Sequence, residues 1–460
     1  MAVWNKIKVG DFLFEREGRY KPESQEISGF RRVDKIDFSG NFHIAEKPSK
    51  TDMILIKQGD LVISGINVAK GALGVYHGRS DVTATIHYSS YTFDESKVSV
   101  EYFKRFLKSP IFIQLLKEQV KGGIKTEIKP KHLLSLEIML PDKEEQLSIL
   151  RRFQRIENED ADLRHELNHQ QTLLKKLRQR ILQEAIEGKL SAGWRAQNPN
   201  LESASELIKR ISAEKAQLIK ENKIKAQKPL PPISDEEKPF PLPHGWEWCR
   251  LGDIAEIKVG ATPDRNNPEY WGGTINWISS GEVANNYIGN AREKITQKAL
   301  GGSSARINPK GSVLVAMIGQ GKTRGQAAIL NIDAATNQNV CAIRPYDGII
   351  PEIIWYFFLS RYERTRSDAS GGNQPALNGI KIRNTVFGLP SIPEANEIIR
   401  TLRKTESLLN QLVGQISKSE LHAEQLMKAV LKEAFSHNRE GEPAAKKGKI
   451  SAHTPEGASI

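Results

Sequence analysis

The sequence is poor in cysteine and in long apolar runs. Its two cysteines, Cys249 and Cys341, lie far apart, and neither belongs to a Cys-x-x-Cys or Cys/His cluster. We therefore expect neither a disulfide framework nor a structural zinc site. The N-terminal stretch MAVWNKIKVGDF has no apolar signal core, and no run reaches the length of a membrane span. These absences predict a cytoplasmic protein with no membrane contact.

The sequence also lacks the patterns of common catalytic sites. It has no acidic pair with a lysine typical of nucleases, no histidine-rich helix for a metal and no nucleophile elbow. Positive charge is what it has in excess, because 67 lysines and arginines against 55 acidic residues give a net charge of +12. Basic side chains gain affinity for polyanions by releasing counterions from phosphates. The composition therefore favours a binding protein with a nucleic-acid partner and no cofactor of its own.

The 460 residues, enough for two or three domains, contain an internal repeat. The segment LPDKEEQLSILRRF from residue 140 aligns with LPSIPEANEIIRTL from residue 389, and the offset of 249 persists along the following stretch. In both copies apolar residues recur at alternating steps of four and three, as in a coiled coil. The seam comprises Ile149, Phe153, Ile156, Asp160, Leu163, Leu167, Gln170, Leu174, Leu177 and Ile181, then Ile398, Leu402, Thr405, Leu409, Leu412, Ile416, Ser419, Ala423, Leu426 and Val430. Either the two stripes bury each other, which we expect, or each helix packs on its own globular domain.

The repeat continues into the globular regions with varying offsets. Trp4 matches Trp246 at an offset of 242, and KQGDLVIS from residue 57 matches PKGSVLVA from residue 309 at 252. The offset is constant along the helices and varies in the globular regions, which indicates a fixed helical scaffold that carries domains with loop insertions. The expected order is a globular domain (1–142), a long helix (143–190), a short charged helix (203–227), a proline-rich linker (228–243), a second globular domain (244–391), a second long helix (392–437) and a basic flexible tail (438–460).

The segment VLVAMIGQGKTRGQAA from residue 313 is similar to a phosphate-binding loop. Such a loop needs a helix directly after its Lys-Ser/Thr pair, because the helix N-terminus binds the anion. Here Gly325 and the strand-like AAILNID follow Thr323, and the matching LVISGINVAKGALGV keeps only Lys70 and Gly71. A turn in a duplicated domain is therefore the preferred interpretation. A nucleotide-dependent enzyme using Lys322 and Thr323, or a coiled-coil adapter that binds only protein, are the alternatives.

The order of globular domain, long helix, proline-rich linker, second globular domain and second long helix resembles that of the specificity subunit of type I restriction-modification enzymes. The resemblance covers about residues 1–437 and rests on GWEWCRLGDI, EYWGGTINWISSGEV, GQGKTRGQAAI, ATNQNV and the Leu-Pro pair before each long helix. It implies an α+β fold, in which two pseudo-repeated target-recognition domains of mixed α and β structure are separated by two long antiparallel coiled-coil helices. It further implies a non-catalytic chain that reads a bipartite, asymmetric target in double-stranded DNA.

The same resemblance implies the partners. The helices would dock two methyltransferase subunits, which bring S-adenosylmethionine and methylate adenine. Separate restriction subunits would bring translocation and cleavage that depend on ATP and magnesium. A stand-alone methyltransferase system without the nuclease would use the same kind of chain, so the sequence leaves both systems open.

Loop residues that can pair with base edges are the candidates for DNA contact. Arginine and lysine match guanine, whereas asparagine and glutamine match adenine. The candidates are Gln320, Lys322, Arg324, Asn337, Gln338, Asn339, Asn373 and Gln374 in the second half, and Asn67, Lys70, Lys121, Lys125 and Thr126 in the first. The alternative for each is a solvated loop position or a phosphate contact. Trp271 and Trp277 are expected to be core aromatics rather than base-stacking groups.

Overall fold

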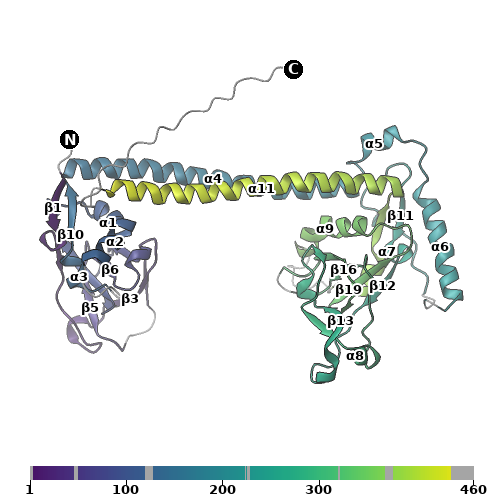
Figure 1. The fold of residues 1–460 in the computed structure, drawn as a ribbon, viewed down its shortest axis with the longest axis horizontal. Helices are drawn as coiled ribbons and strands as arrows, with labels where there is room; N and C mark the ends of the chain where they lie inside the picture. The colour runs from purple at the N-terminus through teal and green to yellow at the C-terminus, as the bar shows by residue number, and fades with distance from the viewer. Residues whose placement is uncertain are drawn as a thin grey trace, which may run out of the picture. The chain divides into compact units, whose positions relative to one another are not determined.

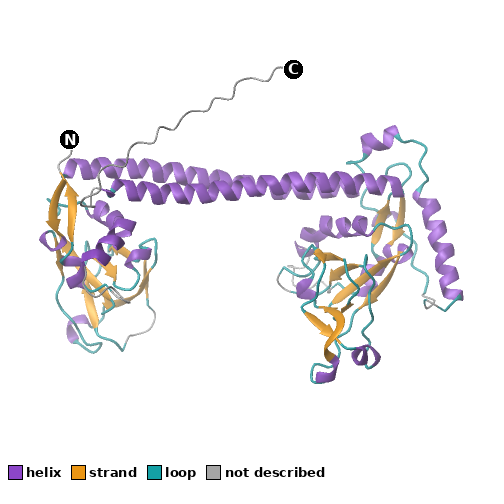
Figure 2. Cartoon of the chain, viewed as in Figure 1, coloured by secondary structure: helices purple, strands orange, loops and turns teal. Residues whose placement is uncertain are grey.

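The structure is a computed structural model that describes residues 4–45, 50–119, 128–222, 224, 228–319, 322–367 and 377–436 (Figure 1). The chain divides into two compact units. Unit 1 combines Met1–Asn168 with Ile416–Ile460, and unit 2 comprises His169–Gln415. Both contain helices and small sheets (Figure 2). The mixed α and β class expected from the sequence is confirmed.

Unit 1 contains two four-stranded sheets. The first has the order β2-β9-β6-β7, with the bounds Leu13–Glu15, Tyr88–Phe93, Leu61–Ser64 and Leu73–Val75. The second has the order β4-β3-β8-β5, with the bounds Phe42–Ile44, Arg31–Ile36, Val82–Thr85 and Met53–Ile56. A separate antiparallel pair joins β1 (Trp4–Lys8) to β10 (Glu137–Pro141). All four residues of β6 are buried, as its largely apolar sequence LVIS requires of a strand in the middle of a sheet.

The core of unit 1 is rich in phenylalanine. Its short helices are α1 (Val100–Lys108), α2 (Pro110–Gln119) and α3 (Pro130–Leu134). The ring of Phe435, just beyond the end of the last helix, lies 5.6 Å from that of Phe106 in α1. It also stacks on Phe153 at 6.0 Å, so residues far apart in sequence share one cluster. The ends of the long helices are therefore part of this core.

Unit 2 is built around a five-stranded sheet. Its order is β12-β19-β16-β17-β14, with the bounds Ala255–Val259, Val340–Pro345, Val313–Ala316, Ala327–Leu330 and Tyr287–Ile288. A three-stranded sheet contains β15 (Glu293–Ile295), β13 (Trp271–Ile278) and β18 (Ala335–Thr336), and β11 (Glu247–Arg250) pairs with β20 (Val386–Leu389). The helices are α5 (Ala192–Gln197), α6 (Ala204–Lys220), α7 (Leu251–Ile254), α8 (Gln297–Gly301), α9 (Pro351–Ser367) and α10 (Gly379–Asn384).

The two units repeat one strand register. In unit 1, β6 pairs with β9 through Leu61 and Tyr91. In unit 2, β16 pairs with β19 through Val313 and Ile343, which are the same two positions shifted by 252 residues. The pair β1 and β10 likewise has its counterpart in β11 and β20. The sequence repeat is therefore also a repeat of strand pairing, and the varying offsets arise in the loops.

Two long helices, α4 (Lys143–Ile186) and α11 (Ile392–Ala434), contribute to both units. In unit 1 the ring stacking of Phe153 on Phe435 places the start of α4 beside the end of α11. In unit 2, Arg178 of α4 forms an ion pair with Glu406 at 3.1 Å and donates a hydrogen bond to Asn410 at 2.9 Å. The helices therefore pack against each other, as the repeated stripes predict.

The buried stripe is narrower than the pattern in the sequence. Near the helix ends, the seam residues Ile149, Phe153, Ile398 and Leu402 also pack on the globular cores. Elsewhere the helix pair shields only a thin strip, so side chains at the edge of the seam reach solvent. The buried seam residues are Ile149, Phe153, Leu167, Ile398, Leu402, Leu409, Ile416 and Ala423. The exposed seam leucines are Leu163, Leu177, Leu412 and Leu426. Part of the apolar stripe is thus available for contacts outside the helix pair.

The proline-rich segment 228–243 is held against unit 2 by Arg250. The buried guanidinium donates to the carbonyls of Pro231 at 2.7 Å and Pro232 at 2.9 Å, and it forms two hydrogen bonds with Glu237. A proline-rich chain lacks N–H donors, so its carbonyls need donors from elsewhere, and arginine supplies several in a rigid fork. The segment is therefore a strap on the surface of this unit.

Candidate nucleic-acid interface

The loop between β16 and β17 carries the cationic candidates of unit 2. Lys322 is exposed, and its carbonyl accepts a hydrogen bond of 2.6 Å from the hydroxyl of Tyr362 in α9. Arg324 is half-buried, and its Nε atom has no hydrogen-bond partner among the described residues. Gly325, in the left-handed region at φ 81°, donates to the carbonyl of Ala316 and returns the chain to the sheet. Strand β17 follows, so the segment after Thr323 forms no helix N-terminus to bind a nucleotide phosphate.

A second loop of unit 2, between β18 and β19, lies beside the first. The N–H of Met317 donates to the carbonyl of Asn339 at 2.9 Å, which joins the start of one loop to the other. Asn337 is buried, and its side chain accepts a hydrogen bond of 3.2 Å from the N–H of Asn339, so it shapes the turn. Gln338 is exposed, and its amide oxygen accepts a hydrogen bond from the hydroxyl of Thr262. Of these three polar residues, Gln338 is exposed, Asn339 is half-buried and Asn337 is buried.

The equivalent loop of unit 1 follows β6. The carbonyl of Asn67 accepts hydrogen bonds from the N–H groups of Lys70 at 3.0 Å and Ala72 at 3.2 Å, which closes a tight turn. Gly71 has φ 97°, and a Cβ atom there would lie only 2.6 Å from the carbonyl oxygen of Phe38. The side chain of Lys70 is exposed on this turn. The structure thus brings Asn67 and Lys70 together on one fixed loop.

The remaining candidates lie outside the described residues. They are Lys121, Lys125 and Thr126 in the first half, and Gln320, Asn373 and Gln374 in the second. Their assignment as DNA-contacting residues stays a prediction.

Two tryptophans of unit 2, Trp271 and Trp277, pack against an arginine. The Arg265 guanidinium lies 3.8 Å from the ring centroid of Trp271 and 4.8 Å from that of the buried Trp277. Its ion pair with Glu293 holds the pKa of that carboxyl below its usual range. Because the cation is fixed between the rings and an acid, this cluster stabilises the small sheet, and its charge is already compensated.

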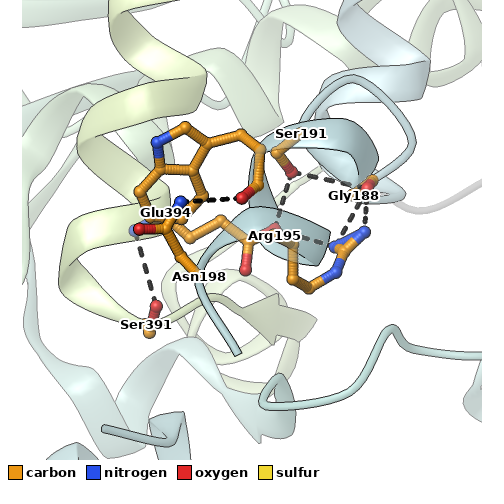
Figure 3. Close-up of polar contacts among 7 residues, drawn as sticks. Gly188, Ser191, Arg195, Asn198, Ser391 and Glu394 are labelled. Carbon is orange, nitrogen blue, oxygen red and sulfur yellow. Dashed lines mark hydrogen bonds and ion pairs between the residues drawn. The ribbon is translucent and has the colours of Figure 1, made fainter. Parts of the chain in front are cut away.

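A buried polar cluster at the start of α11 was not found from the sequence (Figure 3). The Glu394 carboxylate accepts hydrogen bonds from the hydroxyl of Ser191 at 2.6 Å and from the guanidinium of Arg195 at 2.8 Å. Arg195 also donates to the carbonyl of Gly188 at 2.7 Å. These contacts tie the segment after α4 to the first turn of α11. A glutamate near a helix start carries no sequence signal of partners about 200 residues away, so only the fold reveals Ser191 and Arg195 as its donors.

The long helices expose several leucines. In unit 1 these are Leu147, Leu163, Leu421 and Leu426. In unit 2 these are Leu173, Leu177, Leu408 and Leu412, followed by Val413. Exposed apolar side chains on a helix surface are candidates for protein contacts where neighbouring ones gather. We refer to the two sets as the leucine patches of unit 1 and unit 2.

Neither a metal cluster nor a membrane helix is found where the structure is described. Within the described ranges, no three histidine, cysteine, aspartate or glutamate side chains gather as metal ligands would. Across the same ranges, no helix has the length and apolar content to cross a membrane.

Comparisons with known proteins agree with this arrangement. Residues 243–419 match the family model described as the type I restriction modification DNA specificity domain. The type I restriction enzyme EcoAI specificity subunit of Escherichia coli is 67% identical over 84 residues, which is 18% of this chain and 14% of that protein. The HindI specificity subunit of Haemophilus influenzae is 24% identical over 67% of this chain and 68% of its own length.

The matched stretch thus spans about one seventh of the EcoAI subunit. Among solved structures, the HsdS subunit from Thermoanaerobacter tengcongensis shares the fold with a TM-score of 0.53 at 16% identity, covering 94% of this chain and 96% of that one. The family model and the curated relatives point to one family. Residues 243–419 are thus similar to the DNA specificity domain of type I restriction-modification enzymes, and other stretches of the chain are similar to curated specificity subunits.

Proposed function

We propose that this chain is the DNA-specificity subunit of a type I restriction-modification complex and has no catalytic activity of its own. The observation that carries the proposal is the repeat of strand register between β6–β9 and β16–β19, combined with unlike loops after β6 and β16. Two related but unlike surfaces suit a target of two unlike half-sites, whereas identical surfaces would suit a palindrome. The net charge of +12 supports a DNA partner.

The loops after β6, β16 and β18 would contact different chemical groups of the DNA. Lys70 and Lys322 are exposed cations and suit phosphates or guanine, and Gln338 suits adenine. Arg324 is half-buried in the loop after β16, and its guanidinium group is of the type that suits a phosphate or guanine. The buried Asn337 supports the turn that presents Gln338.

The long helices would dock the partner subunits. Each unit has a leucine patch, and two such patches suit two methyltransferase subunits, which would bind S-adenosylmethionine and methylate adenine. Restriction subunits would join this complex in the cytoplasm and bind ATP and magnesium. The chain itself would recognise the DNA target sequence and would serve as the scaffold on which the partner subunits assemble.

Methylation mapping tests the proposal. The full chain is co-expressed with the methyltransferase subunit of its host, and methylated adenines are mapped across the genome by sequencing. We expect one bipartite, asymmetric motif when both chains are present and none with either chain alone. Motif methylation by the methyltransferase alone would contradict the proposal. ATP hydrolysis by the purified chain that is lost in Lys322→Ala would favour the nucleotide-dependent alternative instead.

A further inference from the structure

Two isoleucines are exposed at equivalent positions of the repeat. Ile66 follows β6 and Ile318 follows β16, and the shift of 252 residues that relates the two strands also relates these side chains. Ile66 is 54% exposed and Ile318 is 47% exposed. A single exposed isoleucine is ordinary on a protein surface. The same exposed isoleucine at the same place in both copies points to a shared task.

The backbone around each isoleucine is held in place. In unit 1 the N–H of Gly65 donates to the carbonyl of His87 at 2.9 Å, and its carbonyl accepts from Ile128 at 2.8 Å. In unit 2 the N–H of Met317 donates to Asn339, directly before Ile318. The apolar side chains therefore project from backbone that is anchored on the sheet, which keeps their direction fixed.

Each isoleucine is accompanied by a lysine. Lys70 and Lys322 follow four residues after Ile66 and Ile318, and both are exposed. The residues directly after the isoleucines differ, since Asn67 in one copy corresponds to Gly319 in the other. Unlike residues suit the reading of unlike half-sites, whereas the retained pair of isoleucine and lysine suits a task that does not depend on the sequence read.

We infer that Ile66 and Ile318 are apolar wedges that enter one base step in each half-site and unstack it, so that the neighbouring adenine can leave the duplex for methylation. The inference rests on the proposed function. Apolar side chains inserted between base pairs unstack them and kink the duplex. An enzyme that modifies a base must first take that base out of the stack. Lys70 and Lys322 would hold the adjoining phosphates.

The test compares paired and mispaired targets. The full chain, in complex with its methyltransferase subunit, is given a duplex that carries the mapped motif, and methylation of each half-site is timed separately. Ile66→Ser and Ile318→Ser should each slow methylation about tenfold or more, because the inserted apolar side chain no longer offsets the cost of unstacking the bases. Each variant should slow methylation in one half-site only. A duplex in which the target adenine is already mispaired should restore each variant to about the wild-type rate.

The exposed Ile380 of α10 supplies the matched control, and Ile380→Ser should leave both half-sites unchanged. Equal slowing on paired and mispaired duplexes would overturn the wedge and make the isoleucines direct base contacts. Unchanged rates in both variants would overturn it as well. If the wild-type complex methylates no defined motif, the proposed function itself fails, and that result is distinct from both of these.

Discussion

Glu394 is 2% exposed, and the hydroxyl of Ser191 and the guanidinium of Arg195 both donate to the same carboxylate oxygen. Without this acceptor, Arg195 and Ser191 would each lose a buried partner. Glu394→Ala should therefore lower the free energy of unfolding by about 3 kcal/mol, measured by urea denaturation. The exposed Glu424, paired with Lys428, is the control, and Glu424→Ala should leave stability unchanged. Equal effects of the two substitutions would contradict this role of the buried cluster.

Burial also controls the reactivity of the two cysteine thiols. Burial raises the pKa of Cys341 to about 12 and that of Cys249 well above its usual value. At pH 8 both groups are therefore protonated thiols, which are poor nucleophiles. We expect iodoacetamide to modify neither residue in the native chain and both in urea, as read by mass spectrometry. The exposed variant Lys428→Cys should react under native conditions, and rapid native alkylation of Cys341 would contradict the prediction.

At the scale of elements, two leucines of α11 that occupy seam positions of the same heptad pattern differ in burial. Leu409 is 4% exposed on the buried stripe, whereas Leu412 is 44% exposed and belongs to the leucine patch of unit 2. Leu409→Ala should lower the free energy of unfolding by about 2 to 3 kcal/mol, because it leaves a cavity. Leu412→Ala should barely change stability but weaken binding of the methyltransferase subunit, measured by calorimetry. Loss of stability in both variants, with unchanged binding in Leu412→Ala, would remove the docking role of the patch.

Elements with a continuous pattern could be predicted from sequence, and contacts between distant segments could not. The apolar residues of α4 recur at alternating steps of four and three, and β16 is a continuous apolar run. These are local signals of helix and strand, and both elements formed as expected. Arg250 gave no such signal, since its acceptors lie on the proline strap and become visible only when the chain folds. Asn337 shows the converse, because a residue type suited to adenine is buried as a turn former.

At the scale of the whole molecule, the shared register predicts that the two globular regions can be exchanged as separate DNA-reading domains. Strand β10 ends at Pro141, and α4 begins at Lys143, so residue 142 is a natural junction between the globular part of unit 1 and the helix. We expect that replacing residues 1–142 with the matching region of another specificity subunit changes one half of the methylated motif and keeps the other. Because unit 2 retains the loops after β16 and β18, its half-site should persist.

Sequencing of methylated adenines in cells that express the chimera with the methyltransferase subunit provides the measurement. The reciprocal exchange of residues 244–391 serves as the matched control and should alter only the other half of the motif. An unchanged motif in the first chimera would show that residues 1–142 do not read DNA. The two units have separate cores, one around Phe153 and Phe435 and the other around the five-stranded sheet, which predicts that each reads its half-site independently. A change in both halves of the motif would contradict this independence and show that the two units read the target jointly.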